Sequence, residues 1–282
     1  MSALSATNMP LPPLEDTGER MMPETSGEDT FWEHVYRYAF ACRFITGKRV
    51  LDIACGEGYG TAALQKAGAA SVIGIDVSPE TCEHARQKYG VDAHCGSAEK
   101  IPLPNSSIDV IVSFETIEHL RNPLLFLDEC ARILTPGGRL IISTPNKGLY
   151  RAEEDPNPFH LSEMTESEFA SALRRRFHRI KLHSQHPRFA PRWSLRALAA
   201  DVTPWQGNPR FERIRRSARF RFAPHLVYEF TNEQRLSVVD QILRAREKQR
   251  AFVNTHGVGP RRKWDGEKPA YIIATATRKR NP

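Results

Sequence analysis

Two glutamates and two histidines stand at spacings that suit proton transfer or metal binding. Glu115, Glu118 and His119 occupy positions i, i+3 and i+4 just after a predicted strand, so a helical turn would place all three on one side. His160 follows the next predicted strand, and loops after adjacent parallel strands open on the same cleft, so we expect His160 to meet His119 there. A histidine base removes the proton of a hydroxyl nucleophile as a new bond forms. A divalent metal with carboxylate and imidazole ligands instead lowers the pKa of that hydroxyl.

A glycine-rich turn earlier in the chain is typical of a nucleotide site. The predicted strand Val50–Cys55 runs into Gly56, Gly58 and Gly60, and a helix follows, as such a site requires. Glycines let the backbone approach a ligand closely. A second strand ends in Asp76, 18 residues beyond Gly58, where a carboxylate accepts hydrogen bonds from both hydroxyls of a ribose.

The elements that must position these residues alternate along the chain. The predicted strands are Arg49–Cys55, Ser71–Val77, Val91–Cys95, Ile108–Phe114, Arg139–Ser143, Arg179–Ser184 and Ala270–Thr277. The predicted helices are Phe31–Phe44, Gly60–Ala67, one that starts at Ser78-Pro79, Pro123–Leu134 and Glu163–Leu173. This order predicts an α/β fold with a Rossmann-like, doubly wound sheet of seven strands. The sheet is expected to be mostly parallel, with the last strand antiparallel.

The spacing Asp52-x-x-x-Gly56-x-Gly58-x-Gly60 resembles the cofactor turn of class I S-adenosylmethionine-dependent methyltransferases. Segments in the same order as in that family extend the resemblance: Gly74–Ser78, Gly96–Glu99, Phe114–His119 and Leu134–Gly138. The resemblance implies methyl transfer from S-adenosylmethionine. The cofactor-binding residues that it implies are Asp52, Ala54, Gly56, Glu57, Gly58, Tyr59, Asp76, Val77, Ser97, Ala98 and Phe114.

Each part of the cofactor has its own expected residues under this resemblance. Asp52 and the turn from Gly56 to Tyr59 hold the methionine part, and Asp76 holds the ribose. Val77, Ser97 and Ala98 lie against the adenine. Many members of the family have Asp at position 97, so the serine departs from their pattern.

Two finer resemblances imply different acceptors. Glu115-x-x-Glu118-His119 with His160-x-x-Glu163-x-Thr165 is similar to the metal site of small-RNA 2′-O-methyltransferases, which implies that Glu115, Glu118, His119 and His160 ligate a divalent ion. A longer set of segments looks like bacterial methyltransferases associated with surface-polysaccharide synthesis: Thr17–Glu24, Glu33-His34, Arg37-Tyr38, Gly47–Asp52, Ser143–Asn146 and Asn157–His160. It implies O-methylation of a sugar hydroxyl in a glycan or an activated sugar, with His119 and His160 as catalytic residues.

Simpler interpretations compete with each of these. Glu118-His119 also occurs in methyltransferases that bind no metal, where the pair serves packing, and His160 is equally compatible with a solvent-facing loop. His34 either closes the cofactor pocket or lies on the polar face of the first helix. A third class of function is a catalytically silent module that binds S-adenosylmethionine and recognises a partner.

The basic charge of the chain is concentrated late in the sequence. The net charge of the 282 residues is +7, whereas His186–Arg262 carries 16 Lys and Arg against 6 Asp and Glu, an excess of ten. Arginines there interleave with phenylalanines over Arg210–Phe222, which favours RNA, a nucleotide sugar or a lipid-linked glycan at an anionic membrane surface. An alternating strand with arginines in water explains the same pattern.

The expected organisation is therefore an arm, a core and an insertion. Residues 1–30 are expected to be a flexible arm, 31–185 the methyltransferase core, 186–267 a basic lid with a helix near Glu233–Phe252, and 268–282 the last strand and tail. No apolar run is long enough to span a bilayer, and no secretory signal begins the chain, so a cytoplasmic location is expected. The five cysteines form no metal-binding spacing, and we expect reduced thiols in the core.

Overall fold

The computed structural model describes residues 14, 20–23, 25–26, 28–147, 157–185, 259–260 and 271–279. The strands are β1 (Arg49–Ile53), β2 (Ser71–Asp76), β3 (Asp92–Cys95), β4 (Ile108–Ser113), β5 (Leu134–Pro145), β6 (Phe177–Gln185), β7 (Gly259–Pro260) and β8 (Tyr271–Arg278). The helices are α1 (Glu28–Cys42), α2 (Tyr59–Lys66), α3 (Pro79–Tyr89), the 3₁₀ turn η1 (Ile117–His119), α4 (Pro123–Ile133) and α5 (Glu166–Arg174).

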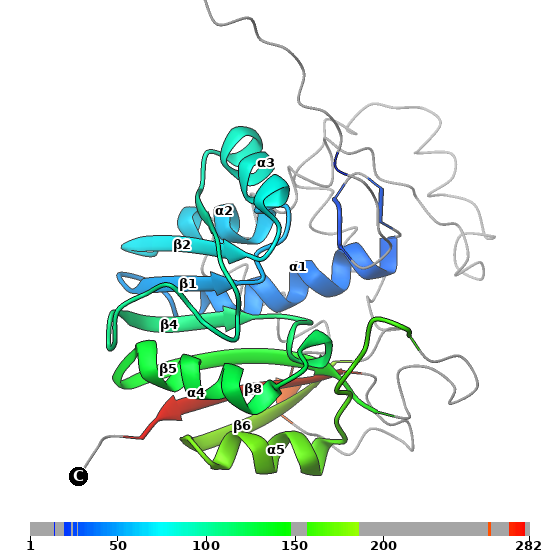
Figure 1. Cartoon of the computed structure of the whole chain (residues 1–282), viewed down its shortest axis with the longest axis vertical. Helices are drawn as coiled ribbons and strands as arrows, with labels where there is room; N and C mark the ends of the chain where they lie inside the picture. The colour runs from blue at the N-terminus through cyan, green and yellow to red at the C-terminus, as the bar shows by residue number, and fades with distance from the viewer. Residues whose placement is uncertain are drawn as a thin grey trace, which may run out of the picture.

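These strands form one mixed sheet, with the order β3-β2-β1-β4-β5-β8-β6-β7 (Figure 1). The strands from β3 to β5 pair in parallel, and β8 is antiparallel to both β5 and β6. The predicted α/β fold with seven strands and an antiparallel last strand is confirmed. The two-residue β7 adds a short antiparallel edge beside β6.

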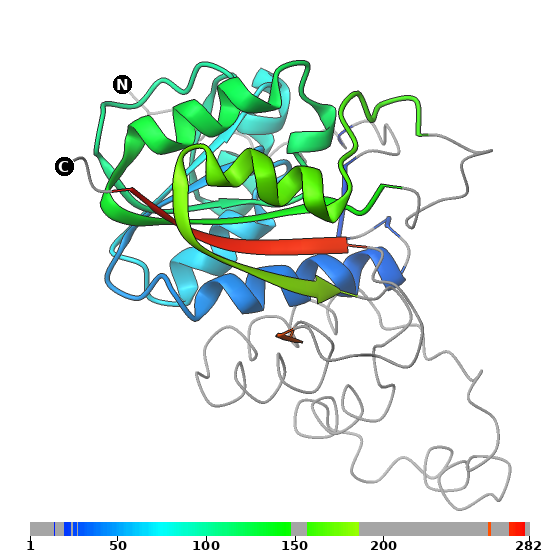
Figure 2. The same cartoon turned by 90° about the horizontal axis from the view of Figure 1, so that it is seen from below.

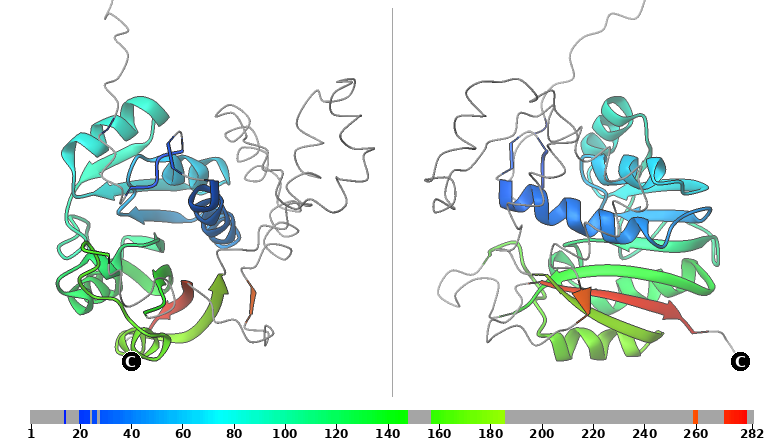
Figure 3. Two further views of the ribbon diagram at one scale, coloured as in Figure 1. Left: turned by 90° about the vertical axis from the view of Figure 1, so that its right-hand side faces the viewer. Right: turned by 180° about the vertical axis from the view of Figure 1, so that it is seen from behind.

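The two faces of the sheet are each covered by helices. Alternate residues of the central strands point to opposite sides, so Val50 and Val112 join a core with α1 and α2, whereas Leu51 and Ile111 join a core with α4 and α5. Figure 2 shows this three-layer arrangement, and Figure 3 shows α1 lying across its face of the sheet. Because strands β1 and β4 are buried on both faces, they read as apolar runs in the sequence.

Helix boundaries follow local capping signals. Ser78, predicted as an N-cap, accepts a hydrogen bond from the amide of Thr81. Thr165 and Glu168 form a reciprocal capping box at the start of α5, which therefore begins three residues later than the predicted Glu163.

The predicted start of the fifth strand was also wrong, by five residues. The residues between the predicted helix Pro123–Leu134 and the predicted strand Arg139–Ser143, which include Gly137-Gly138, were expected to lie outside both elements. The helix instead ends at Ile133, and the 12-residue β5 begins at Leu134, with an irregular register against β4. Gly137 has φ +82°, so the pair forms a distorted start of the strand rather than a separate loop.

The amino-terminal arm contains buried residues that its composition did not predict. Leu14, Met21 and Met22 are each 6% exposed, and Met21 belongs to the same hydrophobic cluster as the buried residues of α1. The cysteine prediction was correct for the four buried thiols and wrong for Cys95, which is exposed at the end of β3. Apart from Gly259–Pro260, the basic insertion 186–267 and its predicted helix lie outside the described residues. Among the described helices, none has the length and apolar character needed to cross a membrane.

Candidate active site

The carboxyl ends of β1, β2, β4 and β5 meet at one edge of the sheet because these strands are parallel. Two non-glycine residues have left-handed backbones there: Ala54, directly after β1, with φ +58°, and Glu115, two residues after β4, with φ +50°. Such conformations cost free energy and persist where surrounding contacts hold them, commonly at functional sites. Ligands of doubly wound folds bind at this edge.

Asp76 connects β2 to the glycine turn after β1. Its carboxylate accepts hydrogen bonds from the amide of Gly56 at 2.9 Å and from the amide of Ser78 at 3.0 Å. Each carboxylate oxygen retains a further lone pair for a ligand hydroxyl. The turn and the second strand are thus joined at the position predicted to hold a ribose.

The structure requires glycine at the three positions of the turn for different physical reasons. A Cβ added at Gly56 would meet only the flexible side chain of Arg20, with 3.8 Å to its Cγ, and no backbone atom within 4 Å. A Cβ at Gly58 would lie 2.7 Å from the Cβ of Ala85 on α3, and Gly58 has φ +96°. A Cβ at Gly60 would lie 1.9 Å from Cζ of Tyr38 on α1. Glycines in this turn were predicted to let a ligand approach the backbone closely. Only Gly56 fits that prediction, because Gly58 and Gly60 instead leave room for residues of α3 and α1.

Asp52 lies behind this turn and is completely buried. Its carboxylate accepts hydrogen bonds from the hydroxyl of Thr61 at 2.8 Å and from that of Tyr38 at 3.2 Å. Burial raises the pKa of Asp52 to about 7, although both hydrogen bonds act in the opposite direction. Tyr38 also packs edge-on against Tyr59 and Phe114, so α1 contacts both the glycine turn and the end of β4. These contacts connect Asp52 to α1 and α2 behind the turn, and its expected contact with the methionine part of the cofactor stays a prediction.

Glu57 points away from the ligand side. Its side chain is fully buried and pairs with Lys88 and with His84 Nε2, the latter at 3.2 Å, both on α3. The turn from Gly56 to Tyr59 was expected to hold the methionine part, and Glu57 can contribute to this only through its backbone, because its side chain is engaged with α3.

The surface beyond Asp76 suits an apolar ring. Val77 follows directly and is 74% exposed, which is unusual for a large aliphatic side chain. Ser97 Oγ accepts a hydrogen bond from the amide of Glu99, so its hydroxyl hydrogen is the group left for a ligand nitrogen. Ala98 is partly buried beside it.

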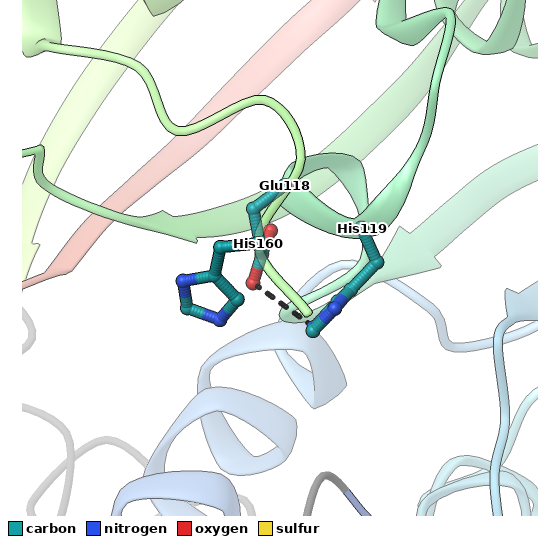
Figure 4. Close-up of side chains that lie close together, drawn as sticks. All are labelled: Glu118, His119 and His160. Atoms are coloured by element: carbon teal, nitrogen blue, oxygen red, sulfur yellow. Dashed lines mark ion pairs between the residues drawn. The ribbon is translucent and has the colours of Figure 1, made fainter. Parts of the chain in front are cut away.

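Two histidines and one glutamate meet at the ends of β4 and β5. The rings of His119 and His160 lie 4.9 Å apart between centroids, as the adjacency of their loops predicted. Glu118 lies beside them, with Oε1 3.9 Å from Nε2 of His119 (Figure 4). Burial, reinforced by Glu115, raises the pKa of the Glu118 carboxyl well above its usual range.

The side chain of Glu115 points away from Glu118 and His119, although the three residues were expected to lie on one side of a helical turn. It precedes η1, and its Oε1 accepts a hydrogen bond from Ser143 Oγ at 2.5 Å and faces Arg37 Nη1 at 3.8 Å. The left-handed backbone of Glu115 breaks the helical spacing on which the expectation rested. Glu118, His119 and His160 come together without it.

Helix α1 supplies Arg37, to which the sequence gave no chemical role, and His34, which was expected either to close the cofactor pocket or to lie on the polar face of the helix. Arg37, which is 1% exposed, donates through Nε to Oε1 of Gln185 at 2.8 Å, and its guanidinium stacks on Tyr271. His34 Nδ1 lies 2.8 Å from the hydroxyl of Tyr59. Burial and the charge of Arg37 lower the pKa of His34 well below its usual value, so the ring is neutral. His34 and Tyr38 are four residues apart and therefore lie on the same face of a helix, which is the sequence signal that could have identified this part of the site.

Comparison with known proteins agrees with this geometry. Residues 51–142 match the family model described as a methyltransferase domain. The chain contains a methyltransferase domain. The matched residues run from β1 to β5 and so include the glycine turn, Asp76 and η1 of this methyltransferase domain.

The chain spans less than two thirds of the length of the curated relatives that it matches. A probable S-adenosylmethionine-dependent methyltransferase of Mycolicibacterium smegmatis is 40% identical over 165 residues, which is 56% of this chain and 62% of that protein. A ubiquinone biosynthesis O-methyltransferase of Parvibaculum lavamentivorans is 36% identical over 116 residues, 39% of this chain and 46% of that protein.

A solved structure shares the fold of the methyltransferase domain. It is an S-adenosylmethionine-dependent methyltransferase of Thermotoga maritima, described as a possible histamine N-methyltransferase, with TM-score 0.53 and 20% identity. The match covers 89% of this chain and 95% of that one.

S-adenosylmethionine is the cofactor of this class of domain, and the described residues fit it. At Gly56 only the flexible side chain of Arg20 lies near the position of a Cβ, so a ligand can approach the backbone when that side chain moves. Asp76 retains acceptor lone pairs for ribose hydroxyls, and the exposed Val77 offers an apolar surface to adenine. When bound, the cofactor supplies a methyl group already activated by its sulfonium.

Proposed function

We propose that this chain transfers the methyl group of S-adenosylmethionine to an oxygen nucleophile, a sugar hydroxyl of a glycan or an activated sugar. The observation that carries the proposal is the pair of His119 and His160 at the same sheet edge as the cofactor turn. A hydroxyl is almost wholly protonated at neutral pH, so the group that the reaction lacks is a base or another means of stabilising the alkoxide.

The two histidines take the catalytic role in this proposal. Nδ1 of His119 lies 3.1 Å from the carbonyl oxygen of Phe159, and Nδ1 of His160 lies 2.6 Å from Oε1 of Glu163. Both oxygens accept, so Nδ1 carries the hydrogen in each ring and Nε2 is the basic nitrogen. Fixed rings of this tautomer are suited to take a proton from an acceptor hydroxyl and to align it for in-line attack.

The expected domain organisation assigns the acceptor to the basic insertion. Its ten excess positive charges within His186–Arg262 favour an anionic acceptor, such as a nucleotide sugar or a phosphate-linked glycan. RNA, methylated at a ribose 2′-hydroxyl, is the competing anionic acceptor.

A second candidate acceptor comes from the relatives. The Parvibaculum protein is called a ubiquinone biosynthesis O-methyltransferase, so a ring hydroxyl of a small lipid-soluble molecule competes with the sugar. Phe159 and Leu161 beside His160 are 51% and 58% exposed, which suits an acceptor with an apolar portion.

The test is methyl transfer from radiolabelled S-adenosylmethionine into a fractionated cell extract from a strain that lacks the protein. The proposal expects label in the carbohydrate fraction, released as a methylated sugar on acid hydrolysis. Label confined to RNA or to the organic-solvent extract would replace the sugar as acceptor. Cofactor binding without label in any fraction would instead favour a silent binding module.

A further inference from the structure

We propose that Glu118, His119 and His160 form a three-ligand site for a divalent first-row transition-metal ion. One ligand atom from each residue lies within 4.8 Å of the other two. Figure 4 shows these side chains turned toward one another, two from η1 and one from the loop after β5.

The buried carboxylate of Glu118 is the strongest observation. The residue is 0% exposed, and its Oε2 accepts a hydrogen bond from the hydroxyl of Thr144 at 3.2 Å. Its Oε1 is buried without a hydrogen-bond partner and faces Nε2 of His119. An unsatisfied buried carboxylate oxygen is costly, and a coordinated cation is a partner that removes this cost.

Both imidazoles are oriented as metal ligands are. A metal-binding histidine usually donates its second ring hydrogen to a carbonyl or a carboxylate, which fixes the tautomer. His119 meets the carbonyl of Phe159 in this way, and His160 meets the carboxylate of Glu163. The amide of Leu161 donates to the backbone carbonyl of Glu118 at 2.8 Å, so the loop that carries His160 is tied to η1.

The geometry leaves Glu115 out of the site. Its carboxylate already engages Ser143 and Arg37, unlike the fourth ligand in the small-RNA 2′-O-methyltransferase pattern. Two imidazoles and one carboxylate favour manganese, iron, cobalt or zinc over calcium. Ligand atoms around such an ion lie about 3–3.5 Å apart, as follows from bonds of roughly 2.1 Å, so binding draws the three side chains inward.

Three protein ligands leave coordination positions for an acceptor oxygen. With Nε2 of both histidines bound to the ion, the ion would replace them as the group that activates the acceptor, by lowering the pKa of a hydroxyl bound there. This one consequence rests on the proposed function. Metal binding itself does not rest on it, because the binding experiment contains neither cofactor nor acceptor.

The test is a titration of the full chain, with any purification tag removed and metals stripped by a chelator. Mn²⁺ binding is followed by the loss of the paramagnetic resonance signal of the free aquo ion, and Zn²⁺ binding by calorimetry. We expect one ion per chain. The variants Glu118→Gln and His160→Ala should weaken binding by at least about tenfold, because each removes a ligand. Glu163→Gln should weaken it by about tenfold, because the hydrogen bond that orients the ring of His160 is altered.

The matched control is His94→Ala. His94 is an exposed histidine beside Asp92, with 2.8 Å between Nε2 and the carboxylate, and its loss should leave the affinity unchanged. Thermal unfolding and binding of S-adenosylhomocysteine report whether each variant is folded. If Glu118→Gln does not fold, the part-exposed Glu163 gives a variant that keeps the test decisive.

Three results would overturn the proposal. The first is no saturable binding of either ion at millimolar concentration. The second is binding that survives His160→Ala but is lost in His94→Ala, which would mark an adventitious surface site. The third is a loss in Glu115→Gln as large as in Glu118→Gln, which would restore a fourth ligand.

Discussion

Replacement of Gly60 by alanine tests whether α1 holds the cofactor turn. A Cβ at this position lies 1.9 Å from Cζ, 2.3 Å from Oη and 2.4 Å from Cε1 of Tyr38. Carbon atoms in contact are about 3.5–4.0 Å apart, so the added methyl overlaps the ring by roughly 1.5 Å or more. Tyr38 must therefore leave its position, together with its hydrogen bonds to Asp52.

The expected cost follows from the contacts that Tyr38 loses. A hydrogen bond to an ionisable group contributes about 1.5–3 kcal/mol, and each of the edge-on contacts with Tyr59 and Phe114 about 0.5–1.5 kcal/mol. We expect Gly60→Ala to lower the free energy of unfolding by about 3–5 kcal/mol, which for a chain of this size is a fall in Tm on the order of 10 °C.

The assay is a double-mutant cycle measured by thermal and denaturant unfolding. In a Tyr38→Ala background the clash is absent, and alanine is a better helix former than glycine by up to about 1 kcal/mol, so Gly60→Ala should be neutral or slightly stabilising there. Equal destabilisation by Gly60→Ala in both backgrounds would refute the reasoning.

Gly56→Ala is the matched comparison at the same turn. The nearest neighbour of its added Cβ is 3.8 Å away, so the cost comes from the left-handed φ of +53°, about 1–2 kcal/mol. This variant should stay folded and lose affinity for S-adenosylhomocysteine in calorimetry. Unchanged affinity in the folded variant would mean that the ligand does not approach Gly56.

Three further predictions concern single side chains. Asp76→Ala removes acceptors of the Gly56 and Ser78 amides as well as the predicted ribose contact, so calorimetry should show cofactor affinity reduced at least about 100-fold; unchanged affinity would contradict the assignment. His160→Ala should leave cofactor affinity intact and slow methyl transfer by about 100-fold or more, measured in single turnovers; an unaltered rate would exclude a catalytic role. Asp52, whose pKa burial raises to about 7 from 3.8, stabilises the fold most below pH 4 and loses this contribution as the pH rises through 7. A cationic cofactor lowers that pKa, so binding near pH 7 should release a proton, seen as a dependence of the binding heat on the ionisation enthalpy of the buffer. Asp52→Asn should abolish this dependence, and its persistence would assign the proton to another group.

Much of the fold was readable in the sequence because its signals are local. The apolar runs of β1 and β4, the N-cap at Ser78 and the spacing from Gly58 to Asp76 depend on residues near one another in the chain. Each of these predicted its element to within a few residues. The adjacency of His119 and His160 also followed, because the order of parallel strands fixes which loops are neighbours.

The direction of each side chain at the site was decided only by the tertiary structure. Gly60 is required by Tyr38, which lies 22 positions earlier in the chain and on another helix, and no local pattern reports that contact. Glu118 joins the histidines while Glu115 turns to Arg37, because a left-handed backbone and a 3₁₀ turn replace the helix that the spacing suggested. Sequence periodicity determines which face a regular element buries, whereas irregular backbone at the strand ends has no period, and only packing against α1 and β5 fixes where its side chains point.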